Sequence, residues 1–406
     1  MTSPPPDTTW QVGEGFILTR RIRRLGSRDA VELWLATDQG PVCVQTPVQQ
    51  PVCFVEQSVS DQLKHLCREA SLPVSFQPSE LTTLEHNPVT VVKTNTENQL
   101  IKLRKLASQR NIQLREADIR LPERFLMERF IFGSMAFKGR SVEGNKVVDI
   151  QAKPSDYKPS LSFISIDIEC DQDERLFSVS IAGKGLNHVI LISNGQFRGP
   201  DTSLSFNLNV VNDEAALLNT LSAHIQAADP DIILGWNVKQ FDMAVLSRRY
   251  TLHGVAMNWG RDGSAVTLQE WSNGQVLVDI AGRCVVDGIE SLKTMTYHFD
   301  SFALNQVADT LLGEQKLVHE ADQLAAIRHL YQHDPVKLAH YNLRDSQLVN
   351  EIESATRFIA FLVLRATLTG LDIARPGGSV AAFLNVYLPR LHRGGYVAGV
   401  RPDNGG

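Results

Sequence analysis

Apolar and polar residues are patterned differently in the two parts of the 406-residue chain. In the first part, short apolar segments of strand length dominate, and an amphipathic helix is predicted over about residues 98–109. The strand-like segments are residues 15–19, 31–36, 42–45 and 89–92. The polar connection KPSDYKPS at residues 153–160 contains two prolines and indicates a domain boundary. We therefore predict a disordered lead-in (residues 1–14) and a mostly β N-terminal domain (residues 15–157).

After this connection, strand patterns alternate with helix patterns. The run DIILG at residues 231–235 is short, apolar and flanked by turn-forming residues, which predicts a buried strand. Asn273 and Gly274 stand between strand-like segments and predict a two-residue hairpin turn. Apolar residues between 304 and 312 recur at helical spacing, and Gly313 is expected to end that helix. The second part is therefore predicted to be an α/β domain.

The predicted strand SFISIDIEC at residues 162–170 carries two carboxylates. Successive side chains of a strand point to opposite faces, so the three isoleucines share one face. Asp167 and Glu169 lie side by side on the other face. This alternation fits an edge strand with a solvated face, and it also fits a pair of functional carboxylates.

A third carboxylate, Asp242, closes the segment GWNVKQFD, which directly follows the predicted buried strand at residues 231–235. A loop that leaves a central strand and enters a helix is where α/β folds place their chemistry. Asp242 is expected in the first turn of that helix. The alternative is plain helix capping, because an Asp there satisfies free amides and the helix dipole.

A fourth carboxylate, Asp345, lies in a helix whose register is well defined. Asp334 followed by Pro335 is typical of an N-cap with proline at the first helical position. The residues that then share one helical stripe are Leu338, Tyr341, Asp345, Leu348 and Ile352. A carboxylate on a core-facing stripe costs several kcal/mol unless it is paired or bound to a metal. Because no Lys or Arg partner is apparent, a functional role for Asp345 is favoured, with Tyr341 one turn before it.

Composition narrows the class of protein. With 43% apolar and 21% charged residues the chain is typical of globular proteins, and its length favours two or three domains. Five scattered cysteines without a C-x-x-C pair argue against a disulfide framework and a zinc site. No apolar run is long enough for a bilayer, and the first residues lack a signal-peptide pattern. We expect a cytoplasmic location and no membrane partner.

The charge of the chain neither indicates nor excludes binding to nucleic acids. The formal net charge of −5 does not indicate a protein that wraps duplex DNA through bulk electrostatics. Two basic clusters, at residues 20–24 and 102–105, fit nucleic-acid contacts or an ordinary solvated surface.

The four carboxylates Asp167, Glu169, Asp242 and Asp345 are candidates for one shared site. Without a cation they would repel one another, and at least one should take up a proton near neutral pH. Oxygen ligands without His or Cys favour Mg²⁺ or Mn²⁺ over zinc. Two such ions, about 4 Å apart, can deprotonate a water and stabilise both the attacking and the leaving oxygen of a phosphodiester. The sequence therefore predicts a two-metal nuclease site.

Three segments in this order, SIDIE, GWNVKQFD and YNLRD, resemble the three exonuclease motifs of the DEDDy 3′→5′ exonucleases. Flanking segments resemble the bacterial polymerase II branch of the B-family DNA polymerases: LPERFLMERF, DPDIILGWN, VVDGIESLK, SFALNQVADTLLGE and RPGGSVAAF. The resemblance runs from about residue 15 to the end. It implies an RNase H-like mixed-sheet exonuclease domain over residues 158–374. It also implies that residues 375–406 return to the N-terminal domain and begin the polymerase palm.

The resemblance also implies a role for each motif residue. Asp167 corresponds to the ligand that bridges two Mg²⁺ or Mn²⁺ ions, and Glu169 to the carboxylate that holds one ion and the attacking water. Asp345 corresponds to a ligand of the first ion, and Asp242 to a ligand of the second, on the leaving-group side. Tyr341 corresponds to the residue that orients the water through its hydroxyl.

Further residues of the motifs are expected to bind the substrate. Asn237 and Phe241 match positions that contact the 3′-terminal nucleotides, although Phe241 also fits plain core packing. His340 stands at the spacing of the general base in the related DEDDh exonucleases, whereas Tyr341 has the DEDDy spacing. The flanks YNLRDSQL favour Tyr341, and His340 is interpreted as a solvated or packing residue.

DNA is the partner that the resemblance implies: a 3′ end enters and nucleoside 5′-monophosphates leave. The N-terminal domain would hold template and single-stranded DNA, and a sliding clamp is a further candidate partner. No polymerase motif follows the segment RGGYVAGVRPDNGG, so this chain is not expected to polymerise. The alternatives are a free-standing DEDD exonuclease for DNA or RNA and a non-catalytic single-strand-binding module.

Overall fold

The computed structural model describes residues 9–142, 144–195, 204–270, 276–313 and 323–399. The chain divides into two compact units. Unit 1 comprises residues 1–159, 365–372 and 378–406, and unit 2 comprises residues 160–364 and 373–377. The first division falls within the predicted connection at residues 153–160. Residues 365–372, which we expected at the end of the exonuclease domain, belong to unit 1.

Unit 1 contains a closed β-barrel and a separate three-stranded sheet. The barrel strands, in their spatial order, are β1 (Trp10–Leu25), β2 (Arg28–Thr37), β3 (Gly40–Gln45), β8 (Lys146–Pro154) and β7 (Ser134–Val142). The sheet strands are β4 (Val52–Glu56), β6 (Pro88–Thr94) and β5 (Val74–Thr82). All four predicted strand segments fall inside strands of the structure, which confirms a mostly β N-terminal part.

The helices of unit 1 are α1 (Gln57–Glu69), α2 (Glu97–Ser108), α3 (Leu121–Met127) and α11 (Ser379–Arg393). Helix α2 confirms the helix predicted over residues 98–109. Helix α11 and the residues 394–399 after it fold back onto this unit. His392 bonds the Glu116 carboxylate at 2.9 Å, and the Val397 N–H donates to the carbonyl of Thr82 at 2.9 Å. These contacts tie the described part of the last segment to unit 1, whereas residues 375–377 belong to unit 2. The return of the whole segment 375–406 stays a prediction.

The lead-in predicted over residues 1–14 needs a correction, because strand β1 already begins at Trp10. From Trp10 to Phe16 this strand pairs antiparallel with β7, and residues 1–8 lie outside the described residues. Trp10 is 57% exposed and Val12 is 72% exposed. The start of β1 is therefore held mainly by backbone hydrogen bonds. Because its apolar side chains are exposed, the sequence there shows no pattern of buried apolar residues.

Unit 2 is built on a six-stranded mixed sheet. The strands, in their spatial order, are β12 (Asn207–Val211), β11 (Leu186–Ile192), β10 (Leu176–Gly183), β9 (Phe163–Cys170), β13 (Ile232–Gly235) and β16 (Cys284–Asp287). A two-stranded sheet is formed by β14 (Thr267–Glu270) and β15 (Val276–Asp279). The helices are α4 (Glu214–Ala228), α5 (Asp242–Leu252), α6 (Gly288–Thr294), α7 (Leu304–Leu312), α8 (Gln323–His333), α9 (Pro335–Thr356) and α10 (Phe358–Thr369), the last of which continues into unit 1.

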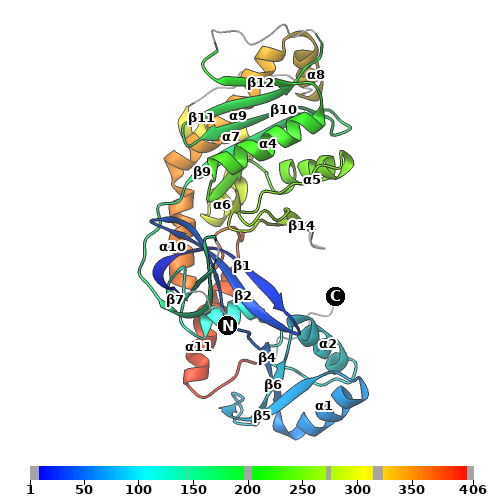
Figure 1. Ribbon diagram of the computed structural model, residues 1–406, viewed down its shortest axis with the longest axis vertical. Helices are drawn as coiled ribbons and strands as arrows, with labels where there is room; N and C mark the ends of the chain where they lie inside the picture. The colour runs from blue at the N-terminus through cyan, green and yellow to red at the C-terminus, as the bar shows by residue number, and fades with distance from the viewer. Residues whose placement is uncertain (1–8, 143, 196–203, 271–275, 314–322, 400–406) are drawn as a thin grey trace, which may run out of the picture. The chain divides into compact units, whose positions relative to one another are not determined.

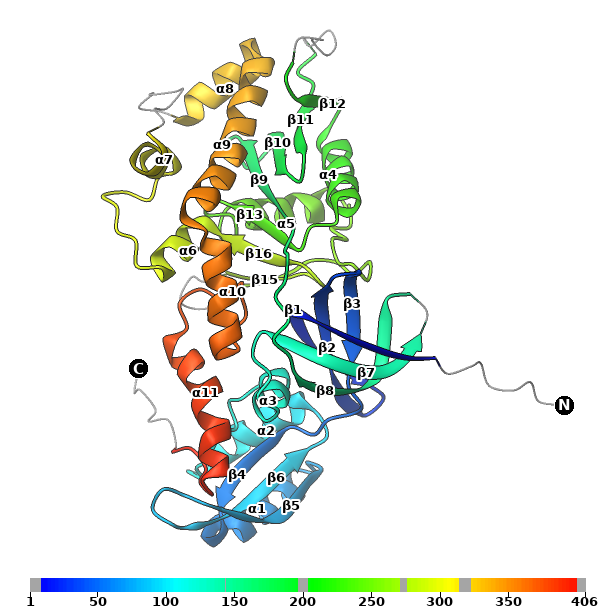
Figure 2. The ribbon, with the colours of Figure 1, turned by 90° about the vertical axis from the view of Figure 1, so that its left-hand side faces the viewer.

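Strand β9 lies inside the sheet, so the interpretation as an edge strand is wrong. It pairs antiparallel with β10 on one side and parallel with β13 on the other. Ile164, Ile166 and Ile168 pack with apolar residues of α4 and α5. The opposite face lies against α9 (Figure 1; Figure 2). It carries Asp167, to which Asn342 of α9 donates a hydrogen bond. The sheet is thus covered on both faces, and its two central carboxylates lie beneath a helix.

Other local predictions in unit 2 are also confirmed. The run at residues 231–235 forms the buried strand β13, and helix α7 ends at Gly313, which has a φ of 71°. The Asp334 side chain caps α9 by accepting from the Lys337 N–H at 3.0 Å. The hairpin turn predicted at Asn273 and Gly274 lies outside the described residues.

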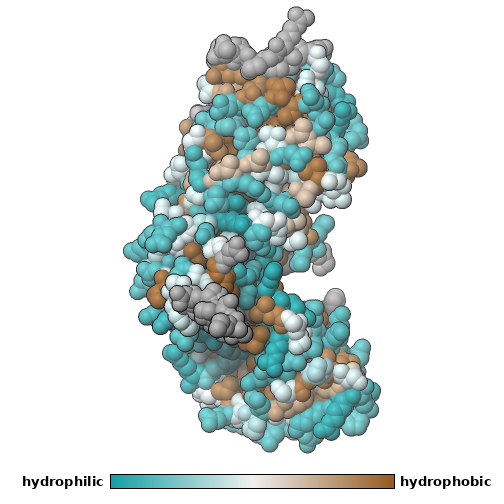
Figure 3. Space-filling view, in the orientation of Figure 1, coloured by the Kyte–Doolittle hydropathy of each residue, from teal (hydrophilic) through white to brown (hydrophobic). Residues whose placement is uncertain are grey.

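Each unit buries hydrophobic cores of its own. In unit 2 the largest core lies between the sheet and helices α4 and α5, and in unit 1 one core fills the barrel and another lies between the small sheet and α1 and α2. On the face drawn in Figure 3, the hydrophobic residues that remain visible form separate patches among hydrophilic ones. None of the helices in the described part of the chain is long and apolar enough to span a membrane.

Candidate metal centre

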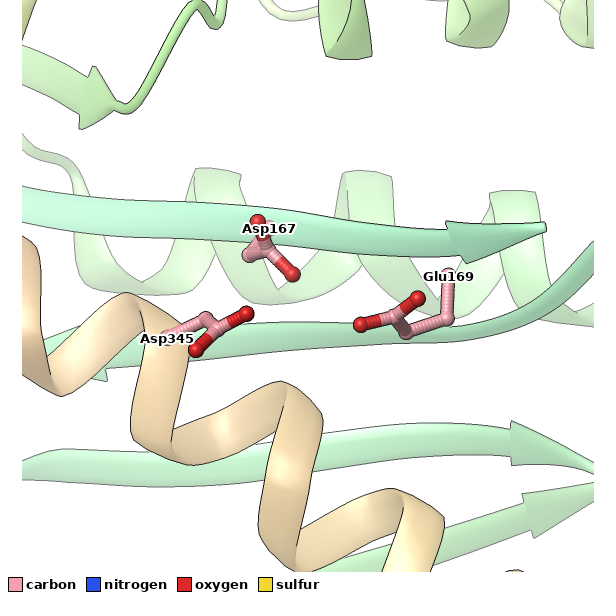
Figure 4. A group of neighbouring side chains, drawn as sticks. All are labelled: Asp167, Glu169 and Asp345. Atoms are coloured by element: carbon pink, nitrogen blue, oxygen red, sulfur yellow. The ribbon is translucent and has the colours of Figure 1, made fainter. Parts of the chain in front are cut away.

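Three carboxylates meet on the α9 side of strand β9. Asp167 and Glu169 come from the strand and Asp345 comes from α9, and each offers an oxygen within 4.8 Å of the others. Figure 4 shows the three side chains turned toward one another between the strand and the helix. Two causes bring them together: residues two apart share one face of a strand, and the capped helix α9 crosses that face. The predicted convergence is thus observed for these three residues.

Asp242 lies against the same strand but outside this group of three. It is the first residue of α5, after the turn that follows β13, and only 2% of it is exposed. Its Oδ1 accepts the N–H of Ile168 in β9 at 3.1 Å. Capping of its own helix therefore does not fully account for Asp242, because the carboxylate is tied to the neighbouring strand.

Burial and mutual repulsion oppose the ionisation of the buried carboxylates Asp167 and Asp242. Burial raises the pKa of Asp167 well above its usual range, and the charges of Asp242, Asp345 and Glu169 raise it further. The Asn342 amide, which donates to Asp167, lowers that pKa. Burial also raises the pKa of Asp242 to about 8. The all-oxygen donor set and this mutual repulsion fit a hard divalent cation, which would allow the carboxylates to ionise together.

The raised pKa values predict that the metal-free fold loses stability with rising pH. A carboxyl group with a raised folded pKa stabilises the fold below its unfolded pKa, about 3.9, and this contribution is lost as the pH rises through the folded value. We expect the free energy of unfolding in EDTA to fall by on the order of 2–4 kcal/mol between pH 5 and pH 9. Urea unfolding at several pH values measures this.

The control for the pH profile is Asp242→Asn, which removes the group whose pKa is about 8. Its profile should be flatter than that of the unmodified chain, and saturating Mg²⁺ should flatten the unmodified profile too. Stability that is constant or rises over this pH range would contradict the prediction.

Tyr341 and His340 are neighbours on α9 but point to different surroundings. Tyr341 is 5% exposed, and its hydroxyl bonds the Asp345 carboxylate. Burial and the nearby carboxylates raise its pKa, so the hydroxyl remains protonated at neutral pH. His340 is exposed, and its ring packs edge-on against Phe206 with centroids 4.8 Å apart. This agrees with the interpretation of His340 as a packing or solvated residue.

Asn237 and Phe241 lie on the turn between β13 and α5, one at each end of a backbone hydrogen bond from the Phe241 N–H to the Asn237 carbonyl at 3.0 Å. Asn237 is exposed and adopts a left-handed conformation with φ 58°. Phe241 is 43% exposed, so the alternative of plain core packing is wrong. Both side chains are therefore accessible to a ligand, and contact with nucleotides stays a prediction.

Two further residues, which the sequence motifs did not single out, lie beside the carboxylates. Asn342 on α9 is fully buried and bonds Asp167 directly. Asp287 ends strand β16, caps α6 by accepting the Ile289 N–H at 2.9 Å, and raises the pKa of Asp242. A signal for Asn342 was present, because it lies one residue after Tyr341 and three before Asp345. Its polar side chain on a packed helix required a partner.

Two protein families match parts of this chain, and one of the matches spans the boundary between the two units. Residues 112–307 match the family described as DNA polymerase family B, exonuclease domain, and residues 15–50 match the one described as DNA polymerase II, N-terminal. DNA polymerase II of Escherichia coli is 37% identical over 388 residues, which are 95% of this chain and 49% of that protein. A DNA polymerase of Archaeoglobus fulgidus is 25% identical over 265 residues, 63% of this chain and 33% of that protein.

The fold is also found in a solved structure. The family B DNA polymerase from Pyrobaculum calidifontis superposes with a TM-score of 0.76 at 17% identity, over 96% of this chain and 52% of that one. The chain belongs to the B family of DNA polymerases and corresponds to their N-terminal and RNase H-like exonuclease regions. It spans about half the length of the Escherichia coli relative.

Proposed function

We propose that unit 2 is a 3′→5′ exonuclease that shortens DNA from its 3′ end and releases nucleoside 5′-monophosphates. The observation that carries this proposal is the convergence of Asp167, Glu169 and Asp345, with Asp242 tied to the same strand, in an exonuclease domain of family B. The DNA polymerase names of the relatives support DNA as the substrate.

Two Mg²⁺ or Mn²⁺ ions are the cofactors that this donor set fits best. Asp167, Glu169 and Asp345 would hold one ion, and Asp167 together with Asp242 would hold the second. When bound, the ions supply a Lewis acid for the attacking water and stabilise the charge on the leaving oxygen. The small volume shared by Asp167, Glu169 and Asp345 supports the first assignment, and the resemblance to the DEDDy motifs supports the second.

The other residues of the site act on the water and on the strand end. Glu169 and the Tyr341 hydroxyl orient the attacking water, because both lie beside Asp345. The exposed Asn237 and Phe241 hold the terminal nucleotides, with the Phe241 ring available for stacking on a base. Stacking and phosphate contacts tolerate any base, so the site should show little sequence preference.

In a complete B-family polymerase this site would serve proofreading. We propose that unit 1 helps to hold single-stranded template, that a polymerase half extends the strand, and that a sliding clamp is a partner of the whole protein. The cytoplasm is the proposed location. These statements rest on the relatives, of which the chain covers about half or less.

The test is digestion of single-stranded DNA that carries a label at either the 5′ or the 3′ end, with Mg²⁺ and with EDTA. The 5′ label should appear on a ladder of shortening strands and the 3′ label as a mononucleotide, both only with Mg²⁺. An RNA strand of the same sequence serves as the control for substrate class. Shortening from the 5′ end, equal turnover of RNA, or tight binding without cleavage would contradict the proposal.

A further inference from the structure

The side chain of Asn342 joins the candidate metal centre to the strand beside it. Its Nδ2 donates to Asp167 Oδ2 at 2.7 Å and to the Asp167 carbonyl at 3.2 Å. Its Oδ1 accepts from the Ser178 hydroxyl of β10 at 2.9 Å. Asn342 and Ser178 are both 0% exposed. The direction of the amide is fixed chemically, because only its NH₂ group can face two acceptor oxygens.

Further buried hydroxyls continue this contact along α9. The Ser346 hydroxyl lies 2.6 Å from that of Ser180, which also reaches the Asn342 carbonyl at 2.9 Å. The Ser165 hydroxyl donates to the Ser346 carbonyl at 2.7 Å. These three serines are fully buried between the sheet and the helix.

Such a network is costly unless every member is paired, so it selects one register of α9 on β9 and β10. A slip of the helix by one residue would leave several buried polar groups without partners. The network therefore fixes the position of Asp345 along the strand relative to Asp167. Within the network, Asn342 contacts a carboxylate of the metal centre directly.

We propose that Asn342 is a positioning residue that holds the Asp167 carboxylate in the orientation needed to bind divalent cations, with Ser178 holding Asn342 in turn. This inference rests on the proposed function. The amide occupies one side of Asp167 Oδ2 and restricts rotation of the carboxylate, so the ligand geometry is set before an ion arrives. Partners of this kind, bonded to a metal ligand, typically change metal affinity by about 10- to 100-fold.

The experiment measures Mn²⁺ binding by electron paramagnetic resonance, without DNA, on the full chain. The variants are Asn342→Leu, which keeps the size of the side chain, and Ser178→Ala, which leaves Asn342 in place. The matched control is Asn350→Leu: Asn350 is on the same helix, but it lies beside Gly183 at the opposite end of β10 from Ser178. A cooperative unfolding transition in EDTA shows that each variant is folded.

We expect the dissociation constant for Mn²⁺ to rise about tenfold or more in Asn342→Leu and less in Ser178→Ala, with no change in Asn350→Leu. DNA cleavage by Asn342→Leu should need a higher Mg²⁺ concentration for half-maximal rate. The loss of rate should be smaller at saturating Mg²⁺. A purely structural role would not shift the metal dependence in this way.

Unchanged Mn²⁺ affinity in Asn342→Leu would overturn the inference while the proposed function stands. If Asn342→Leu does not fold, Ser178→Ala decides by the same measurement, and unchanged affinity there has the same meaning. If the unmodified chain binds no Mn²⁺, the proposed function fails and this inference fails with it.

Discussion

Asp167→Asn is expected to abolish DNA cleavage and, in the absence of metal, to stabilise the fold. The variant keeps the shape of the side chain but removes the charge of the residue assigned to both ions. Lewis-acid stabilisation is worth several kcal/mol, so we expect the single-turnover rate to fall by roughly 10³-fold or more. Rapid-quench measurements with 5′-labelled DNA at saturating Mg²⁺ test this.

The gain in stability follows from the repulsion among the carboxylates. Burial and three neighbouring carboxylates raise the pKa of Asp167, so ionising it at neutral pH opposes folding. Asparagine has no charge to bury, and we expect the free energy of unfolding in EDTA at pH 8 to rise by about 1–3 kcal/mol. Added Mg²⁺ should stabilise the unmodified chain and leave the variant nearly unchanged.

Glu214→Gln is the matched control, because Glu214 is a buried carboxylate that has partners. It bonds Arg249, His253 and the Leu176 N–H, and its pKa is lowered: burial, the largest influence, raises it but is outweighed by these donors. Removing its charge should lower the free energy of unfolding. If both variants destabilise the metal-free fold, the repulsion assigned to Asp167 is absent.

The local parts of the site could be predicted because each depends on spacing along the chain. Asp167 and Glu169 share a strand face, and the cap formed by Asp334 and Pro335 sets the register that turns Asp345 toward the sheet. Such patterns need only the period of a strand or helix and one fixed end. The order of strands does not follow from them, which is why β9 was also compatible with an edge position.

The remaining parts of the site depend on contacts between segments far apart in the chain. Asp242 bonds the backbone of Ile168 only because β13 pairs with β9, and Asn342 finds Asp167 only because α9 crosses the same strand. The start of β1 at Trp10 was missed for a related reason. Its partners lie more than a hundred residues away in β7, and its side chains leave no buried face.

Tyr341→Phe and His340→Ala separate the two assignments of the residue that orients the water. Tyr341 bonds Asp345 from within the site, whereas His340 is exposed and packs on Phe206. Loss of a group that positions or deprotonates the nucleophile typically costs about 10²–10⁴-fold in rate. We expect Tyr341→Phe to lower the single-turnover rate by about 10²-fold or more at saturating Mg²⁺, and His340→Ala to change it less than about twofold.

Metal binding distinguishes this effect from damage to the centre. Tyr341 is not assigned as a ligand, so Mn²⁺ should bind Tyr341→Phe as it binds the unmodified chain, and the lost hydrogen bond should cost only about 0.5–1.5 kcal/mol of stability. Weakened Mn²⁺ binding would mean that Tyr341 acts on the Asp345 ligand instead of on the water. A large loss of rate in His340→Ala, with Tyr341→Phe active, would assign the general base to His340. Helix α9 would then have to turn by about 100° to bring that ring to the carboxylates.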